Sequence, residues 1–248
     1  MHKLSSSDSG MEGSILVIIP AFNEEKTIAA VINRVKEVLP VAELVVIDDG
    51  SRDNTAAQAA ASGARVVHHP FNLGAGSALQ TGFKYALGRN FSYLITLDGD
   101  GQHKPKYIKP LIDEIERGGY DMVIGSRFLS DTRYRAPFFR RLGMRFFSML
   151  TSLAISKKIT DPTSGFRAMR REVVEFCAQD IYPVDYPDAD VIIMLHRAGS
   201  RIGEVSVEMN QPQGKSKQHS GLRPLYYIFK MTLSIFVTLF REKPRLTP

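Results

Sequence analysis

Apolar residues in the first half of the chain form short unbroken runs, and helical patterns lie between them. Five runs rich in Val, Ile and Leu predict strands buried on both faces of a sheet: residues 15–19, 44–47, 65–67, 93–97 and 122–124. After the second run, Asp53 is the expected N-cap of an Ala-rich helix that stops at Gly63. Strands that alternate with helices predict an α/β fold, a Rossmann-like, mostly parallel sheet flanked by helices.

Helical spacing is clearest between the first two predicted strands, where five apolar residues share one face: Ile28, Val31, Ile32, Val35 and Val38. The second half is less regular. Residues 146–155 form an apolar helical stretch, and residues 201–209 alternate like a half-exposed strand.

The segment 225–240 carries one charge, Lys230, and is shorter than the roughly 20 residues that a membrane-spanning helix needs. Lys230, Ser234, Thr238 and Arg241 fall on one helical face, which predicts a C-terminal amphipathic helix lying on a membrane or against a partner. Docking on its own domain or on a second subunit is an equal alternative.

Length and composition predict one globular domain with an appendage, because the chain has 248 residues, 44% of them hydrophobic and 23% charged. We expect a flexible tail over 1–13 without a signal-peptide pattern, a domain over 14–220, and the amphipathic helix and tail over 221–248. The single Cys177 excludes a disulfide scaffold and a cysteine-based zinc site, and we expect it to be buried.

Carboxylates follow the fourth predicted strand. Ligands bind beyond the carboxyl ends of the strands in open sheets of this kind, and Asp98 and Asp100 lie at such an end. Two adjacent anions are costly unless a cation joins them, and oxygen ligands suit Mg²⁺ or Mn²⁺ bridged to phosphates. Gln102 or His103 could complete the shell.

Further polar residues follow the second and third strands. Asp49 is our candidate for accepting a hydrogen bond from a nucleobase N–H. Gly74 and Gly76 permit either close backbone approach to a nucleotide or a tight turn. His68 and His69 are adjacent on a strand and point to opposite faces, so a turn or surface role is expected rather than joint chelation.

Seven motifs span most of residues 15–217 in a specific order. They are Pro20-Ala-Phe-Asn-Glu-Glu25, Asp48-Asp-Gly-Ser-x-Asp53, Asn72-x-Gly-x-Gly76, Asp98-x-Asp-x-Gln-His103, Gly125-Ser-Arg127, Asp161-Pro-Thr-Ser-Gly-Phe-Arg167 and Gly214-Lys-Ser-Lys217. This set resembles glycosyltransferase family 2, and more narrowly its polyprenyl-phosphate, dolichyl-phosphate mannose synthase-like branch. The resemblance implies a GT-A fold and inverting transfer of a hexose from a nucleotide-diphosphate sugar, of GDP-mannose or UDP-glucose type, to a polyprenyl phosphate.

The resemblance also implies roles for individual residues. The nucleotide-sugar site would comprise Pro20, Phe22, Glu24, Ile47, Asp49, Asp98, Gly99, Asp100 and Arg127. The metal, Mg²⁺ or Mn²⁺, would be held by Asp98, Asp100 and Gln102, and the catalytic residues would be Asp100, Arg127, Lys217 and Asp161.

The acceptor side of the resemblance is looser. Gln211 stands where the branch usually carries an arginine, and Asp188 and Asp190 lie where relatives tend to have acidic residues near the acceptor.

The nature of the acceptor decides whether a base is needed. A lipid phosphate oxygen is already anionic, so alignment and charge neutralisation, with Arg127 and Lys217 on the phosphate, would suffice. A sugar hydroxyl, as in polysaccharide synthesis, would require a carboxylate base, Asp161 or Asp188.

A nucleotidyltransferase using the paired aspartates is a further alternative. A nucleic-acid module is disfavoured, because no exposed aromatic residues interleave with basic ones.

Positive charge is concentrated in two segments. The net charge is +6, but residues 127–145 and 205–248 each carry +5, which leaves −4 for the rest of the chain. Arg140 and Arg141 lie in the first segment, where they would either be solvated or face anionic lipid. We therefore expect a cytoplasmic protein in peripheral contact with the inner face of the membrane, with the C-terminal helix as a possible homo-oligomer contact.

Overall fold

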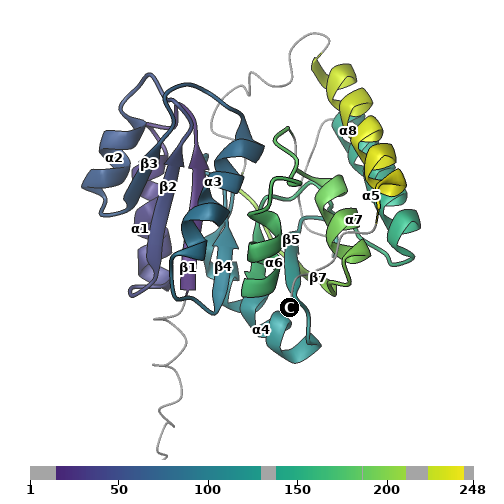
Figure 1. Cartoon of the computed structure of the whole chain (residues 1–248). Coiled ribbons are helices and arrows are strands. Elements are labelled where there is room, and N and C mark those ends of the chain that lie inside the picture. Colours follow the sequence, from purple (N-terminus) through teal and green to yellow (C-terminus); the bar gives the residue numbers. More distant parts are fainter. Residues whose placement is uncertain (1–14, 130–137, 186, 211–222, 243–248) are drawn as a thin grey trace, which may run out of the picture.

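The computed structural model describes residues 15–129, 138–185, 187–210 and 223–242. Within these residues, seven strands form one sheet in the order β3-β2-β1-β4-β6-β5-β7 (Figure 1). The strands are β1 (Ile15–Ala21), β2 (Glu43–Asp48), β3 (Arg65–His68), β4 (Tyr93–Thr96), β5 (Met122–Ser126), β6 (Arg167–Arg170) and β7 (Ile202–Ser206). The predicted mostly parallel α/β sheet is confirmed.

Strand β6 is the antiparallel exception. It lies between β4 and β5 and pairs antiparallel with both, so that Ala168 is opposite Ile95 on one side and Val123 on the other. The sequence analysis missed this strand because its four residues begin and end with arginine and form no apolar run. Its insertion brings the chain that precedes Arg167 to the carboxyl end of β4.

Helices cover both faces of the sheet, as predicted. On one face α1 (Ile28–Val38), α2 (Thr55–Ala61) and α4 (Ile108–Gly118) pack on residues such as Val17 and Val46. The other face carries α3 (Ala75–Leu87), α5 (Phe138–Ile155), α6 (Arg171–Cys177), α7 (Ala189–Arg197) and α8 (Arg223–Phe240). The short 3₁₀ turn η2 (Pro105–Tyr107) leads into α4. Cys177 is buried as expected, and burial raises the pKa of its thiol to about 12.

Two local predictions were wrong. Strand β3 is not buried on both faces, because it lies at the sheet edge and its four residues are exposed or half-buried. Helix α2 begins at Thr55 with Asn54 as its N-cap. The Asp53 carboxylate accepts hydrogen bonds from the backbone N–H of Thr55 (3.0 Å) and of Glu25 (3.3 Å), so it joins the helix start to the loop after β1.

Helix α8 docks on its own domain with part of its polar face turned inward. Met231 and Ile235 are buried in the core beside α7. The Tyr227 hydroxyl donates to Asp188 (2.7 Å), Ser234 donates to Asp190, and Lys230 pairs with Asp185. Among the described residues, no helix is both long and apolar enough to cross a bilayer.

Gly76 allows helix α3 to pack closely on the backbone of the segment before α7. A Cβ atom at this position would lie 2.3 Å from the Val184 carbonyl oxygen and 2.6 Å from that of Pro183. The close backbone approach expected here is therefore made by the protein's own segment before α7, whereas Gly74, with φ of +97°, serves the turn into α3.

We expect Gly76→Ala to lower the free energy of unfolding by about 1–3 kcal/mol, because the added methyl group meets backbone atoms that must shift. Gly143→Ala is the matched control. It also lies in a helix, but nothing lies within 4 Å of its Cβ position, so stability should be unchanged or slightly higher. Denaturant unfolding of both variants measures this, and equal stability of the two would contradict the packing argument.

Candidate active site

The loop after β1 is fastened to the loop after β2 by hydrogen bonds from its backbone. Asn23 N–H donates to Ser51 Oγ (2.9 Å), and Glu24 N–H donates to Thr55 Oγ1 (2.7 Å). The two loops form one edge of the rim at the carboxyl end of the sheet. Phe22 extends from this edge with 43% of its surface exposed, which leaves an aromatic ring available for contact with a ligand.

Asp49 lies at the end of β2 in a buried network. Its Oδ1 accepts from His69 Nδ1 (2.7 Å) and Leu73 N–H (2.9 Å), and its Oδ2 accepts from Gly74 N–H (2.9 Å). His69 Nε2 also contacts Thr81 Oγ1 on α3 (2.9 Å). The expected surface or turn role of His69 was wrong, because its side chain is buried and joins β3 to α3. His68, which pairs with Asp48, is more exposed.

The segment 98–103 forms a tight acidic turn after β4. The Asp100 carboxylate accepts from the backbone and side-chain amides of Gln102, and Asp98 N–H donates to His103 Nδ1 (3.0 Å). His103 is buried and stacks on Phe166 with 5.2 Å between ring centroids. Asn210 braces the turn by hydrogen bonds to the carbonyl oxygens at Gln102 (2.8 Å) and Gly101 (3.0 Å).

Negative charge accumulates at this turn. Desolvation raises the pKa of Asp98, and the charge of Asp100 raises it further, while His103 opposes the shift. Burial likewise raises the pKa of Glu24, with added repulsion from Asp100, Asp98 and Asp53. A cation at this position would relieve the repulsion.

The donor set fits a divalent cation that also binds phosphate. Asp98 is 49% exposed and presents oxygen atoms to solvent, as a hard ion requires. In the described part of the chain, no group of three or more His, Cys, Asp or Glu is arranged to hold a metal by itself. The His103 imidazole does not add a ligand, because its Nδ1 accepts from Asp98 N–H and its Nε2 then carries the proton.

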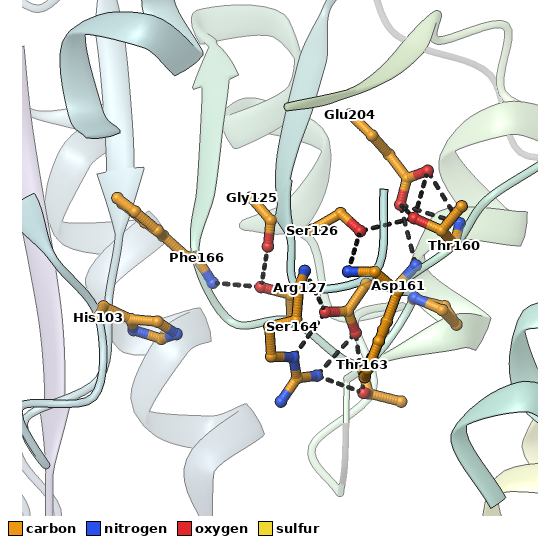
Figure 2. Close-up of polar contacts among 12 residues, drawn as sticks. His103, Gly125, Ser126, Arg127, Thr160, Asp161, Thr163, Ser164, Phe166 and Glu204 are labelled. Atoms are coloured by element: carbon orange, nitrogen blue, oxygen red, sulfur yellow. Dashed lines mark hydrogen bonds and ion pairs between the residues drawn. The ribbon is translucent and has the colours of Figure 1, made fainter. Parts of the chain in front are cut away.

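A buried ion pair joins the end of β5 to the loop before β6. The Arg127 guanidinium donates from Nε (2.6 Å) and Nη2 (2.7 Å) to the two carboxylate oxygens of Asp161, and Arg127 N–H donates to Oδ2 (3.0 Å). Figure 2 shows the two groups facing each other, with Thr163 beside the guanidinium. Arg127 is 6% exposed and Asp161 is 1% exposed, so both charges are taken out of water together.

The backbone around this pair is held by neighbouring polar groups (Figure 2). Glu204 of β7 accepts from the backbone N–H of Thr160 (2.8 Å) and of Asp161 (2.9 Å). Ser164 Oγ donates to the Gly125 carbonyl oxygen (2.7 Å). A Cβ at Gly165 would lie 3.0 Å from Asp98 Oδ1, so the same loop touches the acidic turn.

A second buried arginine, Arg167, lies among acidic groups. It donates to backbone carbonyl oxygens, including those of Ser164 (2.9 Å) and Pro187 (3.1 Å). Burial raises the pKa of Asp188 to about 6, and the positive charge of Arg167 opposes this shift. Burial also raises the pKa of Asp190. Arg167 therefore offsets part of the negative charge beneath the rim.

The structure brings most of the described candidate residues to one rim, and Ile47 is the exception. Ile47 is fully buried and packs in the core, so its side chain does not face the rim. Lys217 and Gln211 lie outside the described residues. Gly99 packs closely on Ala21 and Pro20 below the acidic turn.

Several polar residues of this site have no role predicted from the sequence. They are Ser126, Thr160, Thr163, Ser164, Arg167, Glu204 and Tyr227. Four of them lie within or directly before the quoted motif that starts at Asp161. Tyr227 lies on α8 in an apolar stretch, and nothing in its local pattern indicates a carboxylate partner.

Comparison with known proteins identifies the family. The profile described as Glycosyl transferase family 2 matches residues 16–177, more than half of the chain. The chain belongs to glycosyltransferase family 2. It is therefore a glycosyltransferase, as its motifs predicted.

Named relatives support the similarity to the polyprenyl-phosphate branch. The chain is 35% identical over 167 residues to a polyprenol monophosphomannose synthase of Mycolicibacterium smegmatis, covering 64% of this chain and 63% of the relative. It is 28% identical over 219 residues to an undecaprenyl-phosphate mannosyltransferase of Micrococcus luteus, covering 84% of this chain and 88% of the relative.

Solved structures confirm the GT-A fold. A glucosyl-3-phosphoglycerate synthase from Mycobacterium tuberculosis, in complex with Mn²⁺ and UDP-glucose, matches with a TM-score of 0.66 at 23% identity. The match covers 91% of this chain and 78% of the neighbour.

The Arg127–Asp161 pair yields a stability prediction. Asp161→Asn should lower the free energy of unfolding by about 3–5 kcal/mol, because it leaves the Arg127 charge buried without its counter-ion. Asp180→Asn is the control. It removes an equal charge from the exposed pair with Lys84, and we expect no measurable change in stability, because solvent screens this pair. Similar urea midpoints for the two variants would show that the buried pair does not stabilise the loop.

Proposed function

We propose that the protein is an inverting glycosyltransferase that moves a hexose from a nucleotide-diphosphate sugar to a polyprenyl phosphate, with Mg²⁺ or Mn²⁺ as cofactor. The observation that carries this proposal is the adjacency of two oppositely charged groups at one rim. The Asp98 and Asp100 carboxylates lie on one side, and the Arg127 and Arg167 guanidinium groups are near enough for their charges to lower the pKa of Asp98 against the effect of its burial. Such a rim can hold two phosphorylated ligands at once.

The donor side uses the acidic turn. Asp98, Asp100 and Gln102 are the residues that would hold the metal, which supplies charge neutralisation for the departing nucleoside diphosphate. Pro20, Phe22 and Asp49 line the opposite edge, where the nucleoside would lie. Glu24, close to both carboxylates, adds to the negative field that attracts the cation.

The acceptor side uses the buried arginines. Arg127 is fixed in one orientation by the Asp161 carboxylate, which balances its charge, and Arg167, which donates to backbone carbonyl oxygens, would supply positive charge for the acceptor phosphate. Lys217, in the basic segment that follows β7, is proposed as the second contact to the acceptor phosphate. The phosphate oxygen attacks the anomeric carbon while the bond to the diphosphate breaks, and no proton has to be removed from the nucleophile.

The state of Asp161 favours a phosphate acceptor over a sugar hydroxyl. Both of its carboxylate oxygens are engaged by Arg127, and it is almost completely buried, so it is poorly placed to take a proton from a substrate. Of the two candidate bases, only Asp188 remains, and its carboxylate accepts from the Tyr227 hydroxyl. No comparable observation favours the nucleotidyltransferase alternative.

A transfer assay tests the proposal. The protein is incubated with UDP- and GDP-sugars, Mn²⁺ or Mg²⁺ and a polyprenyl phosphate, and glycolipid is measured by mass spectrometry. We expect a polyprenyl phosphosugar, and a loss of at least about 100-fold in Asp100→Asn, because one metal-binding carboxylate is removed. Asp180→Asn, which removes a distant surface carboxylate, should retain full activity.

Transfer to soluble sugars alone would overturn the lipid acceptor. Undiminished activity in Asp100→Asn would overturn the metal assignment.

An exposed apolar surface on α5 and α8 supports the lipid acceptor. Helices α5 and α8 are in contact through Phe147 and Tyr227 (5.7 Å between ring centroids), and they lie together at one end of the molecule (Figure 1). The two helices expose large apolar side chains at Leu142, Met149, Leu153, Phe229, Leu233, Phe236, Val237 and Phe240. Arg141 and Arg145 are exposed on the same α5 helix and suit anionic headgroups. We propose that this surface lies on the inner face of the membrane.

Vesicle binding tests this surface. Phe229→Ser combined with Phe236→Ser should weaken binding to vesicles containing anionic lipid by at least about tenfold, because two exposed rings no longer enter the bilayer. Val41→Ser combined with Leu87→Ser is the control, since both are exposed apolar residues outside α5 and α8. A wild-type dimer in solution that does not bind vesicles would instead assign the surface to a second copy of the chain.

A further inference from the structure

Asp49 has a limited number of acceptor positions for a nucleobase. A carboxylate offers about four lone-pair positions, two on each oxygen. His69 Nδ1 and Leu73 N–H occupy Oδ1, and Gly74 N–H occupies one position of Oδ2. One acceptor position on Oδ2 therefore remains for a ligand.

The surrounding structure keeps this arrangement in place. Two of the three donors are backbone N–H groups of the loop that leads into α3, and the third is a buried imidazole whose other nitrogen contacts Thr81. The Asp49 side chain is only 4% exposed, so its hydrogen bonds are largely shielded from water. The carboxylate cannot turn to offer a second position without breaking one of these hydrogen bonds.

Nucleobases differ in the number of N–H groups that they present to such a carboxylate. Uracil has a single ring N–H at N3, whereas guanine presents N1–H and the neighbouring amino group together, a pair that matches both oxygens of a carboxylate. At Asp49, the second guanine donor would meet an oxygen that is already saturated. An unpaired donor in a desolvated site lowers affinity.

We propose that Asp49, restricted by His69 and the adjoining loop, selects uracil over guanine, so that the donor is a UDP-sugar. This inference rests on the proposed function, because it takes the donor nucleoside to lie against Asp49. His69 is a positioning residue in this scheme. It sets how many hydrogen bonds the Asp49 carboxylate can accept from the base.

Calorimetric titration of UDP and GDP in the presence of Mn²⁺ tests the inference without any acceptor. We expect wild-type protein to bind UDP at least about tenfold more tightly than GDP. UDP methylated at uracil N3 should bind about tenfold more weakly than UDP, because its single N–H donor is absent. Equal affinities, or tighter binding of GDP, would overturn the uracil assignment while leaving a glycosyltransferase donor site in place.

Variants separate the role of His69 from general stability. His69→Leu frees the second position on Oδ1, so the ratio of GDP to UDP dissociation constants should fall to within about threefold. His68→Leu is the matched control. It removes the neighbouring contact between the exposed His68 side chain and the buried Asp48 carboxylate, and should preserve the ratio.

Thr81→Val provides a second measurement. It removes the far contact of the imidazole but leaves His69 bonded to Asp49, so the preference for UDP should persist even if stability falls. A preference unchanged in His69→Leu would overturn the role of His69. Failure of wild-type protein to bind either nucleotide would overturn the proposed donor site as a whole, and this inference with it.

Discussion

The buried ion pair between Arg127 and Asp161 is the interaction on which the rim depends. It joins the end of β5 to the loop that leads into β6. Both groups are buried, so burying either charge without the other would destabilise the fold. Because β6 is inserted beside β4, this loop passes the acidic turn, with Gly165 against Asp98 and Phe166 stacked on His103. The cationic and anionic halves of the site are thus parts of one packed unit.

The separation of charge across the rim would allow one site to bind both anionic substrates of the proposed reaction. Burial, and then repulsion between neighbouring carboxylates, raises the pKa values of Asp98 and Glu24, and a cation would relieve both effects. Arg127 and Arg167 are held by acceptors of the protein itself, so the positions of both guanidinium groups are fixed before any ligand arrives. Such preorganisation suits chemistry in which alignment matters more than proton transfer.

Helix α8 links this site to the apolar surface. Its hydroxyl and ammonium groups bind the acidic residues around Asp188, at the start of α7, while rings such as Phe229 and Phe236 face outward. An amphipathic helix with an outward apolar face is unusual for a water-exposed surface, and it is typical of a helix that contacts lipid or protein. Helix α8 therefore contributes both to the packing around Asp188 and to the proposed membrane surface.

Much of the fold and site was determined by the sequence alone. Apolar runs predicted four buried strands, helical spacing predicted α1, and the position of Asp98 and Asp100 after a strand placed the acidic turn at the rim, because these features depend on neighbours in the chain. Tertiary structure alone decided that β6 is antiparallel, that Asp161 binds Arg127, that His69 is buried against Asp49, and that α8 turns polar groups inward. Local sequence patterns indicate which positions are buried. They do not report which distant partner satisfies a buried charge, because that partner is supplied only when segments far apart in sequence pack together.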